Sequence, residues 1–157
     1  MAKIQCLYRG YLRIADRWVY LSPIVDLGTR LFIARVFFMS GLTKINDWAG
    51  TLYLFNNEYN VPVLSPTIAA YMATTGELGL SVLLVLGLGR RFAAAGLFIL
   101  NGVAAISFPD LSEAGHYQHL CWGIMLGLLL VYGGSEWGVD GWFTGYGSKR
   151  VDGCKKN

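Results

Sequence analysis

The chain has 157 residues and a net charge of +3; 54% of its residues are hydrophobic, only 15% are charged, and its mean hydropathy is +0.43. A soluble domain usually has about 25% charged residues. The composition therefore argues against a water-soluble enzyme and a disordered chain, and the small net charge argues against a nucleic-acid partner. The three cysteines are widely spaced, without a CxxC pair or the Cys/His spacing of a zinc site, which excludes a disulfide scaffold and a local dithiol motif. The composition favours a membrane protein.

The first segment, residues 1–22, has the pattern of an amphipathic helix. Between residues 3 and 19, apolar and aromatic side chains recur at helical spacing, and Arg9, Arg13 and Arg17 fall on other positions. Basic residues opposite aromatic ones suit a helix that lies in the headgroup region of a membrane. We therefore expect an interfacial helix on the cytoplasmic side, ending before Pro23.

Four apolar stretches follow, at about residues 24–43, 65–89, 92–108 and 117–134. Each is close to the roughly 20 residues that cross a bilayer. The last two show no polar face over about five turns, which is typical of a membrane span and argues against a soluble all-α protein. The sequence predicts an all-α integral membrane protein: a four-helix transmembrane bundle over residues 23–135, the N-terminal interfacial helix, and a cytoplasmic tail over residues 136–157.

The longest connection, residues 45–64, holds Trp48, Tyr53, Phe55 and Tyr59. Aromatic side chains concentrate at the membrane–water interface. Non-helical backbone at membrane depth is tolerated only where protein or a water-filled cavity covers it. We expect an interfacial helix or a re-entrant segment that caps the helices at the outer side.

The basic residues are distributed unequally between the two sides of such a chain. Cytoplasmic loops carry an excess of Lys and Arg. Ten basic residues lie on one side and only Lys44 on the other, which predicts that both termini are in the cytoplasm. The ten are Lys3, Arg9, Arg13, Arg17, Arg90, Arg91, Lys149, Arg150, Lys155 and Lys156.

Polar residues inside the predicted spans are the first candidate site. Arg35 is expected near the bilayer centre with Arg30 about 7–8 Å nearer the cytoplasm, and Glu77 and Asn101 are central in spans two and three. Charged groups at this depth normally face the interior and pair, so Glu77 is expected to pair with Arg35 or Arg30. In one alternative, the pair only fixes the helix register. In the other, the second guanidinium is left uncompensated, because Asp26 lies about a turn below Arg30, and it binds an anionic or carbonyl ligand such as a quinone.

A second polar group is expected near the outer face. It contains Lys44, Asp47, Trp48, His116 and His119, and the two histidines would share a helix face if the helix includes His116. A metal ion would need a third ligand, for which no ligand motif is present. We expect hydrogen bonding from these histidines, with His119 as a ligand-binding candidate, and no metal.

Three segments together resemble the DoxX family of small four-helix bacterial membrane proteins. An arginine followed by an apolar run and Gly-x-x-Lys, from Arg30 to Lys44, is similar to the first helix of that family. The segment from Gly76 to Arg91 resembles its second helix, with a central Glu and a basic turn, and the Gly-rich end from Gly133 to Phe143 resembles its terminus. The resemblance extends over about residues 27–143 and implies a location in the inner membrane of a bacterium.

The resemblance implies a role beside membrane redox or oxidative-stress complexes, because the family name is linked to subunits of a thiosulfate:quinone oxidoreductase. By position, Arg30, Lys44 and Glu77 match the polar residues of the family, whereas Arg35 and His119 depart from its pattern. We expect an accessory subunit, not catalytic alone, that binds a quinone-like ligand beside a membrane or peripheral protein partner. The alternatives are a permease or channel subunit for an anion or metal, requiring a homo-oligomer, and a purely structural anchor.

Overall fold

The computed structural model describes residues 21–59, 61 and 63–132, and this part of the chain is helical, as predicted. The expected N-terminal helix over residues 3–19 and the tail over residues 136–157 fall outside the described residues. Each of the four apolar stretches coincides with a long helix, and the connection at residues 45–64 contains a short one. The helices are α2 (Ser22–Asn46), α3 (Trp48–Asn57), α4 (Pro66–Leu86), α5 (Arg90–Ser107) and α6 (Glu113–Tyr132).

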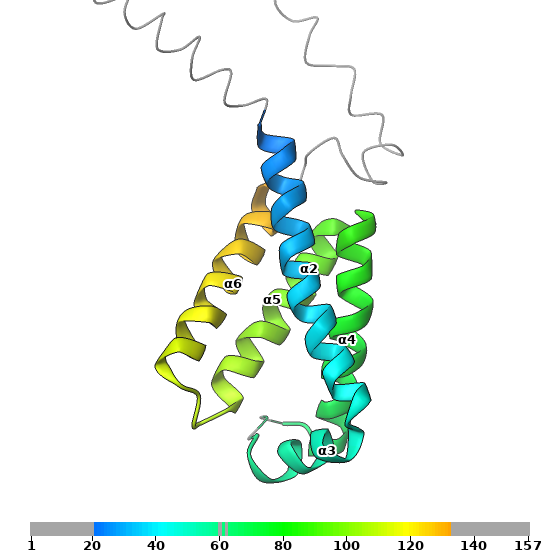
Figure 1. Ribbon diagram of the computed structural model, residues 1–157, viewed down its shortest axis with the longest axis vertical. Helices are drawn as coiled ribbons and strands as arrows, with labels where there is room; N and C mark the ends of the chain where they lie inside the picture. Colours follow the sequence, from blue (N-terminus) through cyan, green and yellow to red (C-terminus); the bar gives the residue numbers. More distant parts are fainter. Residues whose placement is uncertain (1–20, 60, 62, 133–157) are drawn as a thin grey trace, which may run out of the picture.

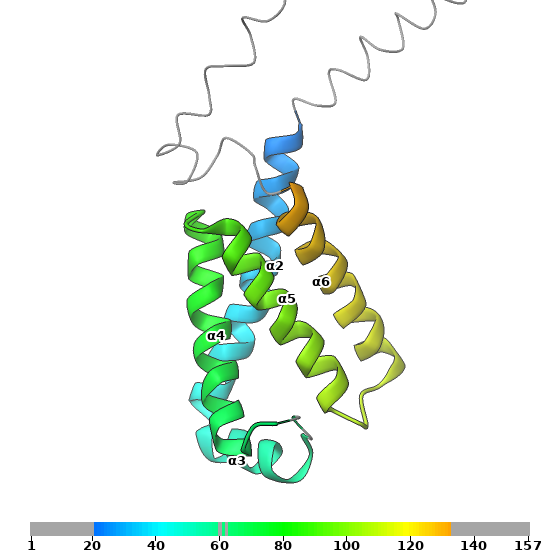
Figure 2. The same cartoon turned by 180° about the vertical axis from the view of Figure 1, so that it is seen from behind.

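The four long helices pack around a shared core. α2 packs against α4, α4 against α5 and α5 against α6, and α6 returns to contact α2. Figures 1 and 2 show α3 lying across the end at which α2 passes into α4. The main core contains apolar side chains from all four long helices: Ile33, Ala34, Phe37, Leu84, Ala93, Ala94, Leu97, Leu126 and Leu129.

The short helix α3 has its own small core. Phe55 of α3 packs on Ala69 and Ala70 of α4, with Trp48 and Tyr59 at the edges. α3 begins where Asp47 caps its first turn, because the Asp47 carboxylate accepts a hydrogen bond from the Gly50 backbone N–H at 2.9 Å. The connection thus contains a helix, one of the two alternatives expected for it, and this helix covers the first turns of α4.

A glycine-rich turn reverses the chain between α4 and α5. Gly87 ends α4 with φ of 72° and Gly89 precedes α5 with φ of 55°. Both values lie in the left-handed region, which glycine adopts without the steric cost that a Cβ would bring. The turn brings Arg90, the first residue of α5, back toward the core, where it is only 6% exposed.

The described helices expose many large apolar side chains and bury several polar ones. Phe32, Ile99 and Val131 are 51%, 63% and 66% exposed, whereas Glu77 and Asn101 are 8% and 4% exposed. Monomeric soluble proteins rarely expose such extended apolar surface. Among the helices in the described part of the chain, α4 has both the length and the apolar composition of a candidate membrane span.

Candidate functional site

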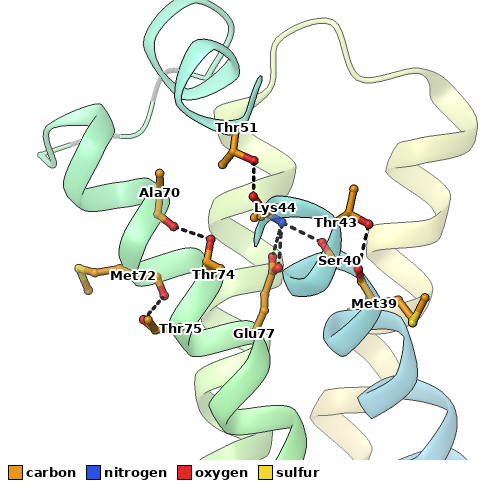
Figure 3. Close-up of polar contacts among 10 residues, drawn as sticks. All are labelled: Met39, Ser40, Thr43, Lys44, Thr51, Ala70, Met72, Thr74, Thr75 and Glu77. Carbon is orange, nitrogen blue, oxygen red and sulfur yellow. Dashed lines mark hydrogen bonds and ion pairs between the residues drawn. The ribbon is translucent and has the colours of Figure 1, made fainter. Parts of the chain in front are cut away.

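A largely buried ion pair joins α2 to α4. Lys44 Nζ donates hydrogen bonds to both carboxylate oxygens of Glu77, at 2.9 Å to Oε1 and 2.8 Å to Oε2, and a third to Ser40 Oγ at 2.8 Å. Figure 3 shows the ammonium group between these partners. Because an ammonium group has three protons, this arrangement uses all the hydrogen-bonding capacity of Lys44.

α3 holds the Lys44 end of this pair through the Lys44 backbone. Thr51 Oγ1 donates to the Lys44 backbone carbonyl at 3.1 Å (Figure 3). Gly41, one turn before Lys44, allows α2 to approach α4 closely: a Cβ there would lie 2.8 Å from Leu78 Cγ and 3.4 Å from Glu77 Cβ. The close contact of the two helices therefore places the lysine over the carboxylate.

The expectation that Glu77 pairs with Arg35 or Arg30 is wrong, because the ion pair is with Lys44. The expectation assumed that residues halfway along two helices lie at the same depth. α4 begins beneath α3, so its midpoint lies opposite Gly41, near the end of α2. Arg35 is six residues earlier, about 9 Å along the helix axis.

Arg30 lies in a separate cluster at the opposite end of the helices. Its Nε is 3.2 Å from Asp26 Oδ2, one turn earlier on α2, and Arg90 Nη1 of α5 is 3.9 Å from the same oxygen. Arg30 is 2% exposed, so the cluster is buried. The sequence alone assigns Arg90 to a cytoplasmic turn. Its helical spacing from Ala94, Leu97 and Asn101 nevertheless places it on the buried face of α5 that these three residues share.

Arg35 is on the outer surface of α2, away from both clusters. The buried residues of α2 are Arg30, Ile33, Ala34, Phe37 and Gly41, which form one helical stripe. Arg35 is on the opposite side of the helix. It does not meet Glu77, Lys44 or the Asn101–His119 pair in the described structure.

Asn101 and His119 form a bidentate pair between α5 and α6. Asn101 Nδ2 donates to the His119 backbone carbonyl at 2.8 Å, and Asn101 Oδ1 is 2.8 Å from His119 Nδ1. Because the His119 carbonyl can only accept a hydrogen bond, the Asn101 atom that faces it is the amide nitrogen. The Asn101 atom that faces the ring is then the amide oxygen, which also can only accept. His119 Nδ1 must therefore carry the proton.

This protonation state leaves Nε2 of the neutral His119 ring as a hydrogen-bond acceptor. Among the described residues, Nε2 has no hydrogen-bond partner, and the His119 side chain is only partly buried. Trp122 lies edge-on to the ring, 5.1 Å between centroids, and Phe37 contacts Trp122 at 6.1 Å. The acceptor therefore belongs to an aromatic environment.

The two hydrogen-bonded pairs lie at similar depth. Gly76, next to Glu77, faces Leu100, next to Asn101: a Cβ on Gly76 would lie 2.8 Å from Leu100 Cδ1. α4 and α5 therefore present Glu77 and Asn101 at one polar level. Four of the six predicted site residues thus form two separate pairs, Lys44 with Glu77 and Asn101 with His119.

Tyr59 is a further residue at this end that sequence reasoning assigned only to the interface. Its ring stacks on Phe55 at 4.8 Å and contacts Phe108 of the α5–α6 connection at 5.3 Å. Burial raises the pKa of the Tyr59 hydroxyl, and the negative charges of Glu77 and Glu58 raise it further. The phenol is thus electrostatically linked to the Glu77 carboxylate, and no sequence signal indicated this.

The two histidines do not converge on a metal-like arrangement. His116 Nδ1 is 3.2 Å from the Ser112 backbone carbonyl, whereas His119 binds Asn101. In residues 21–59, 61 and 63–132, no three His, Cys, Asp or Glu side chains are grouped closely enough to hold a metal ion. Both histidine side chains therefore form hydrogen bonds, as expected from the sequence.

Comparisons with known proteins give one match. The family model described as DoxX matches residues 25–110, more than half of the chain, from the start of α2 to just beyond α5. The match includes Arg30, Lys44, Glu77 and Asn101, whereas His119 lies beyond it. Neither the curated proteins nor the solved structures gave a match. The chain belongs to the DoxX family and is a membrane protein of that family.

Proposed function

We propose that α2, α4, α5 and α6 cross the inner membrane of a bacterium as a four-helix bundle, with both termini in the cytoplasm and α3 at the outer surface. Their lengths of 25, 21, 18 and 20 residues lie within the range of membrane spans. Exposed apolar side chains on all four helices and charged groups in the interior support this assignment. The placement of Lys and Arg supports the orientation.

We further propose that the chain is an accessory subunit of a membrane redox system and binds a quinone-like ligand in its reduced, hydroxyl-bearing form. The observation that carries this proposal is the fixed protonation of His119, with Nδ1–H donating to Asn101 and Nε2 free to accept. A hydroxyl of a hydroquinone donates to such an acceptor, whereas a quinone carbonyl cannot.

The neighbouring groups favour a ligand that donates hydrogen bonds over one that only accepts them. Lys44, the cation paired with Glu77, already donates three hydrogen bonds and has none left for a carbonyl oxygen. The oxygens of Glu77 retain lone pairs that can accept a second hydroxyl. The ring of Trp122, which is only partly buried beside His119, offers an aromatic ligand an offset or edge-on contact.

Mass spectrometry of protein extracted into native nanodiscs tests the proposal. We expect a quinone-type lipid near one molecule per chain in the wild type, reduced severalfold in His119→Phe. Cys121→Ser is the matched control, because Cys121 is exposed on the same helix two residues away, and it should retain the lipid. Wild-type protein without such a lipid would contradict the proposal and favour a structural anchor.

A further inference from the structure

We propose that the outer face of α2 around Arg35 docks a transmembrane helix of a different protein that carries an Asp or Glu at mid-membrane depth. The inference rests on the proposed membrane crossing of α2, but not on the ligand at His119. It concerns a surface on the opposite side of α2 from the buried core.

Arg35 stands at the middle of an otherwise apolar stripe. Leu31, Phe32 and Met39 are 46%, 51% and 52% exposed on the same face, and Arg35 is exposed between them. These residues and Gly28, separated by three, four or seven positions, follow the helical repeat. We call this surface the Arg35 stripe: Gly28, Leu31, Phe32, Arg35 and Met39.

A guanidinium in this position is energetically costly unless it is paired. Arginine at the centre of a membrane helix costs about 2.5–3.5 kcal/mol on the mildest scale, and such residues normally find a partner. Long side chains reach the headgroups when they lie near helix ends. Arg35 is 13 residues after the first residue of α2 and 11 before the last, so headgroup phosphate is a poor partner for it.

The described part of this chain offers no matching carboxylate to a second copy. Glu77 is bound to Lys44 in the interior and Asp26 to Arg30. The other carboxylates, Asp47, Glu58, Asp110 and Glu113, lie at helix ends or in connections. A two-fold contact between the stripes of two copies would place two guanidinium groups together. A carboxylate from another protein supplies the bidentate, oppositely charged partner that Arg35 lacks among the described residues.

Gly28 is a second, independent feature of the Arg35 stripe that favours contact with another helix. A Cβ at Gly28 would meet nothing within 4 Å, so this glycine does not serve packing within the described part of the chain. Small residues at membrane helix surfaces let a second backbone approach closely. The open glycine and the arginine on one face together fit an incoming helix.

Site-directed photo-crosslinking in native membranes tests the proposal. A photoreactive amino acid at Phe32 should capture a membrane protein, and the cross-linked segment should be a transmembrane helix with an Asp or Glu near its centre. Arg35→Leu should lower the yield at least about tenfold, because one member of a desolvated charge pair is lost. Arg35→Lys should retain part of the yield. The same probe at Leu128, on the exposed face of α6, is the control and should not capture this segment.

Charge reversal gives the decisive outcome. Arg35→Glu should abolish the cross-link, and exchange of the partner's acidic residue for arginine should restore it. Capture of a second copy of this chain, of its own tail, of lipid alone, or of a segment without a central carboxylate would overturn the proposal. Quinone content measured on Arg35→Leu protein separates the two proposals, because that variant should keep its ligand even when docking is lost.

Discussion

Lys44 and Glu77, separated by 33 positions in the sequence, share two short hydrogen bonds, at 2.9 and 2.8 Å, between the end of α2 and the middle of α4. The side chains are only 19% and 10% exposed. Removal of one member of a buried ion pair leaves the other charge without compensation, whereas removal of both leaves apolar packing. The pair is therefore expected to behave as a unit.

Single variants of this pair should be more harmful than the double variant. We expect Lys44→Met or Glu77→Leu to lower the free energy of unfolding by about 3 kcal/mol, and the combination to cost less than the sum. Reversible unfolding in mixed detergent micelles measures this double-mutant cycle. Arg91→Met, at an exposed position, is the control for loss of a positive charge. Additive losses would show that the two side chains do not interact.

The helical pattern of α2 indicates which of its basic residues are buried, but not which carboxylate each of them pairs with. Arg30 and Lys44 share a helix face with Ile33, Phe37 and Gly41, whereas Arg35 shares one with Phe32 and Met39. This periodicity separates the buried from the exposed cations.

The depth of Glu77 could not be read from the sequence. It depends on how α3 folds over the start of α4, which is a tertiary contact. The four long helices themselves were predictable, because each is a long apolar stretch with a break at its end. The Asn101–His119 pair joins residues on two separate helices, so their composition does not reveal the protonated ring nitrogen.

The contact between α2 and α4 should tolerate no side chain at Gly41. An added Cβ would come within 2.8 Å of Leu78, whereas one at Gly79 would meet nothing within 4 Å. Both Gly→Ala variants gain a similar amount of helix propensity. We expect Gly41→Ala to be less stable than Gly79→Ala by about 1–3 kcal/mol, as measured by unfolding in detergent micelles. Equal stability of the two variants would contradict the close packing of α2 on α4.

Nitrogen NMR of histidine-labelled protein should detect the protonation state of His119. The chain has two histidines, so His116→Gln leaves one signal set to assign. We expect a protonated Nδ1 and an unprotonated Nε2 at neutral pH, because Asn101 Oδ1 accepts from Nδ1. Asn101→Leu should remove this preference. A protonated Nε2 in the wild-type ring would contradict the assigned hydrogen bonds.

Tyr59 should titrate above the usual tyrosine pKa of about 10. Burial and the charges of Glu77 and Glu58 disfavour the phenolate, so the folded chain holds the proton more strongly than the unfolded chain. The resulting stabilisation is present below the unfolded pKa and is lost as pH rises through the raised value. Tyrosinate absorbance, as the difference between wild type and Tyr59→Phe, measures the titration. Glu77→Gln should lower this pKa, and an unchanged value would show that the phenol is remote from the carboxylate.

The central claim is that the polar level inside the helices receives a ligand hydroxyl at His119 Nε2. Binding of a short-chain hydroquinone and of the matching quinone to nanodisc-reconstituted protein, followed by Trp122 fluorescence with Trp122→Phe as the blank, tests it most directly. We predict tighter binding of the hydroquinone, and a loss of about tenfold or less in its affinity in His119→Phe, as for one hydrogen bond of about 1 kcal/mol. Equal affinity for the two forms, or a hydroquinone affinity unchanged in His119→Phe, would contradict the account.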